Sequence, residues 1–422
     1  DSFTDIRSHW SEDFSGFSRI FMGQTRSACG DSNSLKVKEA QRRLAEDFND
    51  IILVTTNDLD YIEGASDCHF TFDNGYEKLG DRMFRLVDKE IYGASAYDST
   101  IYTPMIIDAY LITETTLIIE TDAVNLYDNG IDVNKFSLSN SGGALINSLS
   151  VSDNQIIFNL SQEPDSNVNI SYDGLGYGAS NNSDELIFNT NTVDGISIVC
   201  FNEYPVDTSL ESIWSDGEWS KGIPNAQMSA VIDADYNTTA LSGNMEAKDL
   251  TVESGKTLDF DSGTTNNVIV HGDLTINGTF IIGDNEALVM PNNSSNVTGN
   301  ITKKEKSTDR NDLYDITYWS SPVISLDAQI SNVFPGVNLN RIFYYDQSKS
   351  QATAPSEPGY WDVWQLASGD MIAGKGYAAE GIDSSVHSIE FTGVPNNGDI
   401  SVDVVYQDPG NDFNLIGTPY PS

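Results

Sequence analysis

Beyond residue 94 the chain consists of short strand-like runs separated by turns rich in Asn, Asp, Ser, Thr and Gly. Regularly spaced runs of this kind predict all-β modules. Residues 94–206 predict a β-sandwich. Residues 207–300 repeat at a short, strand-length period, as in KDLTVESGKTLDF and NVIVHGDLTINGT, which favours a parallel β-helix over a flattened sandwich. Residues 301–422 predict a further, jelly-roll-like sandwich.

Residues 1–93 have a different pattern. FSRIFMG is strand-like, and the apolar β-branched run DIILVTT is typical of a central parallel strand. Two amphipathic segments, LKVKEAQRRLAEDF and GYEKLGDRMFRLVDKEIYG, predict helices on either side of that run. The order strand, helix, strand, loop, helix predicts the second half of a doubly wound α/β domain.

The charge of the chain excludes some classes of partner. Lys and Arg total 22 against 63 Asp and Glu, which gives a formal net charge of -41. Phosphate-rich partners need clustered basic residues, so we expect neither nucleic acid nor an anionic membrane as a partner. No apolar stretch is long enough to span a bilayer. From the opening DSFTD and the ending TPYPS we expect an internal fragment of a larger secreted protein.

His69 is the strongest candidate for a catalytic residue. It lies two residues after Asp67, in the loop that follows the predicted central strand. In open α/β sheets, active sites lie at this carboxyl edge. A His positioned by a carboxylate takes a proton from a serine hydroxyl. The alternative is an ordinary surface histidine that caps the next helix.

Several short motifs in this region resemble those of SGNH hydrolases of the sialate O-acetylesterase and acetylxylan esterase type. The matching residues are Lys38-Glu39-Ala40-Gln41, His69, Gly75-Tyr76, Leu79-Gly80 and Arg82. The resemblance covers about residues 1–93. It implies a secreted carbohydrate O-acetylesterase with a Ser–His–Asp mechanism, in which His69 is the base and Asp67 its orienting acid. It implies no cofactor and no metal.

Two features depart from the family pattern. The family commonly has Asp-x-x-His, whereas one residue separates Asp67 from His69, so Asp60 and Glu63 are alternative orienting acids. The GDSN at residues 30–33 looks like the family's nucleophile block, but only one helix and one strand separate Ser32 from His69. We therefore expect Ser32, Asn33 or Ser34 to cap the helix that starts near Leu35, the true serine to precede Asp1, and the fragment alone to be inactive.

The chain has three cysteines, at positions 29, 68 and 200. Cys29 and Cys68 each follow a predicted parallel strand, so both would lie at the same edge of the sheet. A Cys29–Cys68 disulfide is therefore expected to brace the His69 loop, the alternative being two free buried thiols. Cys200 lies in the apolar run SIVCF and is expected to be a buried core residue.

Weaker candidates lie in the β modules. The acidic turns DADYN (233–237) and DNGID (128–132) contain ligands that Ca²⁺ prefers, but solvated turns are the favoured reading. The pairs Trp214/Trp219 and Trp361/Trp364 suit stacking on sugar rings, although packing in the core is the more common role of such residues.

The C-terminal phrases GKGYAAEG, FTGVPNNGDISVDV and FNLIGTPYPS resemble the module that precedes the sorting domain in type IX-secreted proteins of Bacteroidetes-type bacteria. Thr418 takes the place of the Asn in the family's final phrase. This resemblance implies an extracellular or cell-surface location. The expected partner is an acetylated polysaccharide or glycan, and the expected state is a monomer. The alternative function is that of a structural, adhesive or glycan-binding surface protein without catalysis.

Overall fold

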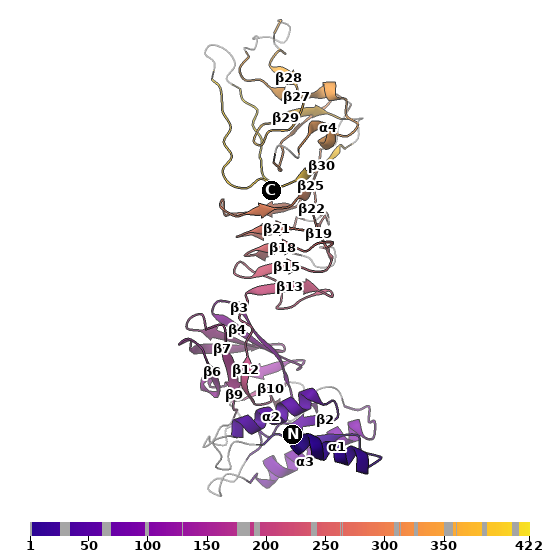
Figure 1. The fold of residues 1–422 in the computed structure, drawn as a ribbon, viewed down its shortest axis with the longest axis vertical. Helices are drawn as coiled ribbons and strands as arrows, with labels where there is room; N and C mark the ends of the chain where they lie inside the picture. Colours follow the sequence, from indigo (N-terminus) through magenta and orange to yellow (C-terminus); the bar gives the residue numbers. More distant parts are fainter. Residues whose placement is uncertain are drawn as a thin grey trace. The chain divides into compact units, whose positions relative to one another are not determined.

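The computed structural model divides into two compact units, Asp1–Leu210 and Glu211–Ser422 (Figure 1). It describes residues 2–25, 34–60, 69–97, 101–128, 130–174, 186–189, 195–237, 243–261, 263, 265–307, 312, 314–324, 328–349, 358–359, 361–381, 386–406 and 413–422.

The first part of unit 1 is built of helices around a pair of parallel strands. Strands β1 and β2 pair in parallel, with Ile20 opposite Ile51. The predicted order of strand, helix, strand, loop and helix is present, and a further helix precedes it. Two strands do not define a doubly wound sheet, so the SGNH assignment stays a prediction. The elements are α1 (Ser2–Asp13), β1 (Ile20–Gly23), α2 (Ser34–Asp47), β2 (Ile51–Val54), the π-helical η1 (Phe72–Glu77) and α3 (Lys78–Glu90).

The rest of unit 1 is antiparallel β-structure around one core. Alternate side chains of its strands point inward, as Leu117 and Ile119 of β4 and Phe158 of β8 do. One sheet has the order β3-β4-β8-β7, a second β12-β9-β6 and a third β11-β10-β5. The elements are β3 (Ile106–Thr113), β4 (Thr116–Thr121), β5 (Leu126–Asp128), η3 (Val133–Lys135), β6 (Phe136–Ser139), β7 (Ile146–Ser152), β8 (Gln155–Leu160), β9 (Asn169–Tyr172), β10 (Ile187–Asn189), β11 (Ile196–Ser197) and β12 (Phe201–Pro205).

Unit 2 begins with a β-solenoid, which Figure 1 shows as a ladder of stacked strands. Successive rungs add a parallel strand to each of three stacks, in register, so that Leu250 lies opposite Leu274. The first stack is β13 (Glu211–Ser215), β15 (Ser229–Ile232), β18 (Leu250–Val252), β21 (Leu274–Ile276) and β24 (Val297–Thr298), with β14 (Glu218–Trp219) at its edge. The second is β16 (Tyr236–Asn237), β19 (Thr257–Phe260), β22 (Thr279–Ile282) and β25 (Ile301–Lys306). The third is β17 (Met245–Ala247), β20 (Asn267–Val270) and β23 (Ala287–Val289).

Side chains at the corners tie neighbouring rungs together. The Asp249 carboxylate accepts a hydrogen bond from the backbone N–H of Asp273 (2.7 Å), and Asp273 accepts one from Asn296 (2.8 Å). At the first rung, Trp214 packs against Trp219 with ring centroids 5.6 Å apart and is itself buried. The packing role for this tryptophan pair is therefore confirmed.

The solenoid continues into an antiparallel sheet. Strand β30 (Ser388–Gly393) pairs with β25, and a separate sheet has the order β26-β29-β27-β28. A single hydrophobic core extends from Val252 in the solenoid to Tyr377 in this sheet. The remaining elements are β26 (Ile316–Trp319), α4 (Ile330–Val333), η6 (Leu339–Arg341), β27 (Ile342–Tyr345), β28 (Trp364–Leu366) and β29 (Tyr377–Glu380).

The prediction of all-β modules after residue 93, including a solenoid-like region, is confirmed. The expectation that the chain has no membrane span also agrees with the structure. Among the described residues, no helix has both the length and the apolar character that crossing a membrane requires.

Phe280 tests whether in-register packing stabilises the solenoid. Its ring is buried, with its centroid 6.4 Å from that of Phe260. We expect Phe280→Ala to lower the free energy of unfolding of unit 2 by about 3–5 kcal/mol, because it leaves a cavity between rungs. The matched control, Ile281→Ala, alters the outward-facing neighbour and is expected to cost about 1 kcal/mol or less. Denaturant unfolding followed by circular dichroism measures both, and equal losses would contradict this account.

Candidate active site

The chain that leaves the carboxyl end of β2 is buried. Thr55, Thr56, Asn57 and Asp58 are polar, yet each is almost inaccessible to solvent. Buried polar groups need partners, and here the partners come from α3, from the β-structured segment 195–200, and from Gln24 and Thr103. Part of the edge predicted to hold the active site is therefore closed by packing.

Asp58 lies at the centre of this buried region. Its carboxylate forms a two-pronged ion pair with the guanidinium of Arg82 from α3, and it lies 3.2 Å from the Nζ of Lys78. Arg82 also donates to the carbonyl oxygens of Thr55 (3.2 Å) and Gly195 (3.0 Å). One guanidinium thus joins β2, α3 and the sandwich segment.

The surroundings of Asp58 favour its charged form. Burial acts to raise the pKa of the carboxyl group, but the charge and hydrogen bonds of Arg82, with a contribution from Lys78, outweigh it. The pKa of Asp58 is consequently lowered from its ordinary value. Because this carboxylate is already paired, it cannot serve as the orienting acid of His69.

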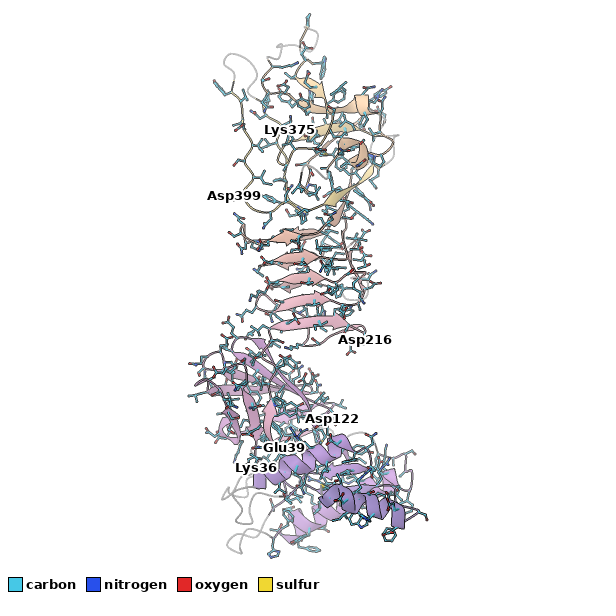
Figure 2. The ribbon with its side chains drawn as sticks, viewed as in Figure 1. Lys36, Glu39, Asp122, Asp216, Lys375 and Asp399 are labelled. Carbon is cyan, nitrogen blue, oxygen red and sulfur yellow. The ribbon has the colours of Figure 1, made fainter. Side chains whose placement is uncertain are left out.

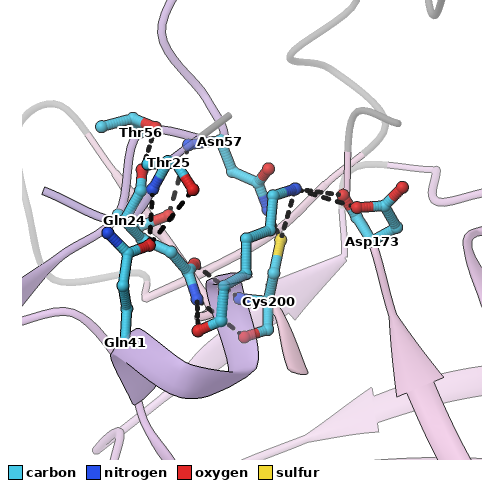
Figure 3. Close-up of polar contacts among 9 residues, drawn as sticks. Gln24, Thr25, Gln41, Thr56, Asn57, Asp173 and Cys200 are labelled. Carbon is cyan, nitrogen blue, oxygen red and sulfur yellow. Dashed lines mark hydrogen bonds and ion pairs between the residues drawn. The ribbon is translucent and has the colours of Figure 1, made fainter. Parts of the chain in front are cut away.

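A second buried polar cluster lies beside the carboxyl end of β1 (Figure 3). The side chain of Gln24 accepts a hydrogen bond from the backbone N–H of Cys200 (2.9 Å) and donates to the carbonyl oxygen of Cys200 (2.8 Å). Lys38 of α2 is buried and donates to the Asp173 carboxylate (2.9 Å) and to the Cys200 Sγ (3.6 Å). The Asn57 amide also donates to this sulfur (2.7 Å).

Cys200 is the buried core residue that the sequence predicts. Burial raises the pKa of its thiol, and the nearby charge of Lys38 offsets only part of that effect. A thiol that stays protonated and inaccessible is a poor nucleophile. The cluster therefore joins the β-structured part of unit 1 to β1 and α2. The carboxylate of Glu39 in α2 also accepts a hydrogen bond from the backbone N–H of Asn202 (3.2 Å) (Figure 2).

His69, in contrast, is exposed to solvent. Its Nδ1 lies 3.5 Å from the hydroxyl oxygen of Tyr76, whose ring meets that of Phe70 edge to face at 5.5 Å. Backbone hydrogen bonds hold the chain next to His69. The N–H of Asp60 donates to the carbonyl oxygen of Asn74 (3.2 Å), and the N–H of Thr71 donates to the carbonyl oxygen of Asp60 (2.9 Å).

Gly75 makes this close approach possible. A Cβ there would lie 2.5 Å from the Phe70 Cβ and 2.8 Å from the Asp60 carbonyl oxygen, so a larger residue would push the loop apart. The Gly-Tyr pair that the sequence singles out therefore has a steric role next to His69.

The structure tests only part of the predicted triad. Of the three alternative orienting acids, Asp60 alone is described, and its carboxylate makes no hydrogen bond or ion pair with His69. Asp67, Glu63, Ser32, Cys29 and Cys68 lie outside the described residues, so their predicted roles and the disulfide stay predictions.

The acidic turns serve the backbone where the structure describes them. Asp128 Oδ1 accepts from the N–H groups of Gly130 (2.8 Å) and Ile131 (2.7 Å), and Asp235 accepts from Thr257 (2.9 Å). In the described part of the chain, no group of three or more His, Cys, Asp and Glu side chains is arranged to hold a metal ion.

Sequence comparison places the chain in a family. A model described as a domain of unknown function (DUF8693) matches residues 207–422, which is more than half of the chain. The chain belongs to this family. The DUF8693 region begins close to the boundary between Leu210 and Glu211 that separates the two units, so it corresponds to unit 2. No curated protein and no solved structure matches the chain.

Asp58→Asn tests the buried ion pair. Removing one charge leaves Arg82 buried without its counter-ion, so we expect unit 1 to lose about 3–5 kcal/mol of stability. The control is Asp81→Asn, on the exposed side of the same helix, with an expected change within about 0.5 kcal/mol. Denaturant unfolding of unit 1 measures both.

The same pair gives a pH dependence with a defined sign. The folded-state pKa of Asp58 is lowered, so its stabilising contribution is present above the unfolded-state pKa of about 3.9 and is lost as the pH falls through the folded-state value. The stability of Asp58→Asn should fall less steeply than that of the wild type in this acidic range. Parallel curves would contradict the assignment.

Thiol counting tests the predicted Cys29–Cys68 disulfide. Alkylation in denaturant without reductant should modify one cysteine, Cys200, and alkylation after reduction should modify all three. Intact-mass spectrometry gives both counts. Modification of three cysteines without reductant would show that the bridge is absent.

Proposed function

We propose that residues 1–93 are the acid–base part of a secreted carbohydrate O-acetylesterase, with His69 as the general base. One observation carries the proposal: His69 is exposed between two anchored segments at the carboxyl end of a parallel strand. The buried Asp58–Arg82 pair fixes the chain before it, and the close packing at Gly75 fixes the chain after it.

This arrangement suits proton transfer. A general base must reach substrate while its backbone stays in place, and an exposed ring on an anchored loop meets both needs. In an SGNH-type mechanism, the imidazole accepts the proton of a serine hydroxyl as the serine attacks the acetyl carbon. It then donates that proton to the leaving sugar oxygen. Water then attacks the acetyl-enzyme, with the imidazole again as the base, which releases acetate and restores the serine.

The remaining roles follow the family resemblance. In that family the nucleophilic serine lies well upstream of the histidine, and in this proposal Asp67 orients His69. The hydroxyl oxygen of Tyr76 lies 3.5 Å from the Nδ1 of His69. The substrate is an acetylated polysaccharide, and the protein acts as a monomer at the cell exterior. The strong negative charge supports a substrate that carries no phosphate.

Ester hydrolysis by the longer protein tests the proposal. With p-nitrophenyl acetate and an acetylated xylan as substrates, His69→Ala should lower kcat/KM by at least about 10³-fold, because the base is lost. His9→Ala, at an exposed histidine of α1, should leave the rate unchanged.

The 422-residue chain alone should hydrolyse neither ester. Full activity in His69→Ala would end the proposal that His69 is the general base. Absence of ester hydrolysis by the unsubstituted longer protein would favour a structural or adhesive surface protein instead. Activity in this chain that is lost in Ser32→Ala would instead assign the nucleophile to the GDSN segment.

A further inference from the structure

The sheet β26-β29-β27-β28 of unit 2 has two unlike faces. Residues directly opposite each other in paired antiparallel strands lie on the same face. Trp319, Tyr377 and Ile342 lie on one face and are buried in the core. The other face, which we call the aromatic face, carries Ile316, Tyr318, Phe343, Trp364 and Leu366.

The aromatic face is partly open to solvent, because Phe343 and Trp364 are half-buried while other residues of the face are exposed. Tyr318 is 61% exposed, Leu366 52% and Ile316 48%. Single exposed apolar side chains are ordinary on a protein surface, but a contiguous set on one sheet face marks a binding surface. Within the described residues of unit 2, this set faces away from the hydrophobic core.

Two rings of this face are held in a fixed arrangement. Tyr318 and Trp364 come from the two edge strands, whose backbones lie about 14 Å apart at the usual strand spacing. Their ring centroids are nevertheless 6.4 Å apart, with the ring planes inclined by only 28°. Tyr345 lies against Trp364 with ring centroids 5.2 Å apart and ring planes nearly perpendicular. We call the pair of nearly parallel rings, Tyr318 and Trp364, the platform.

Polar groups border the platform. Arg341 and Glu380 form an ion pair in the next row of the same face, and the guanidinium of Arg341 lies 4.9 Å from the ring centre of Tyr314. Their outer atoms offer donors and acceptors to hydroxyl groups. The Nζ of Lys375, a residue labelled in Figure 2, lies 3.7 Å from the ring centre of Tyr344. Tyr344 packs against the core, so this charge lies on the core side of the sheet and not on the aromatic face.

A cavity of about 360 Å³ adjoins this face at Leu366. Its volume is within the range of small-molecule sites. Its walls combine four apolar side chains with four polar ones, which suits a ring that has apolar C–H faces and hydroxyl edges. The apolar residues are Ile330, Leu339, Leu366 and Ala367, and the polar ones are Gln329, Ser331, Asn340 and Ser368.

We propose that the aromatic face and this cavity bind a neutral polysaccharide. A pyranose ring presents C–H groups that pack on aromatic rings and hydroxyls that pair with the Arg341–Glu380 border and the polar cavity walls. The net charge of -41 repels anionic polymers, so the glycan that fits is uncharged. The proposal concerns unit 2 alone and does not depend on the esterase proposal.

Affinity electrophoresis of the full chain in gels containing soluble xylan, mannan or β-glucan tests this site. Retardation by at least one of these polymers is expected, with none by polygalacturonate. Tyr318→Ala should weaken binding about tenfold, because one stacking ring is lost. Tyr318→Phe keeps the ring and should bind like the wild type. Tyr92→Ala, at an exposed tyrosine of unit 1, is the matched control and should also leave binding unchanged.

Several outcomes would overturn the proposal: no retardation by any neutral polymer, equal retardation by polygalacturonate, or unchanged binding in Tyr318→Ala. A dimer in size-exclusion chromatography that Tyr318→Ala dissociates, together with no glycan binding, would make the face a protein interface instead. Because His69→Ala should bind glycan normally, failure of the esterase proposal and failure of this one are distinguishable.

Discussion

The buried ion pair between Asp58 and Arg82 organises the first unit. It joins the end of β2 to α3, and through the carbonyl oxygen of Gly195 it reaches the β-sandwich. Removing either member of a buried ion pair leaves an uncompensated charge, so the pair favours the arrangement of strand, helix and β-structure in which both members meet. His69 follows this anchored segment in the chain, and the backbone N–H of Thr71 bonds to the carbonyl oxygen of Asp60 at 2.9 Å.

In-register stacking plays the corresponding role in the second unit. Each rung places apolar residues directly above those of the rung before, and the corner aspartates repeat the same bond from rung to rung. The second stack does not end in an open edge, since β30 pairs with β25, and the core continues into the terminal sheet. The aromatic face therefore rests on a rigid support, which reduces the entropy lost when a ligand binds.

The sequence predicts local patterns better than long-range contacts. The helices over 35–48 and 75–93, the short parallel repeats and the burial of Cys200 follow from periodicity and apolar runs. The Lys38–Asp173 and Gln24–Cys200 contacts were not foreseen, because their partners are more than a hundred residues apart and no spacing rule connects them. The sequence does contain one indication of such contacts, the polar run Thr55–Asp58 directly after the predicted central strand. Polar residues in that position point to a catalytic role or to burial with partners distant in the sequence.

These contacts divide the carboxyl edge of the β1–β2 pair into two parts. At Cys200 and Asp58 the edge is packed against the sandwich, and the polar side chains there satisfy one another. At His69 the ring faces solvent and its described contact is a weak one with Tyr76. Chemistry on a polymeric substrate needs an open edge, because a glycan chain cannot enter a closed core. Among these described residues, His69 is exposed, whereas Asp58 and Cys200 are buried and paired.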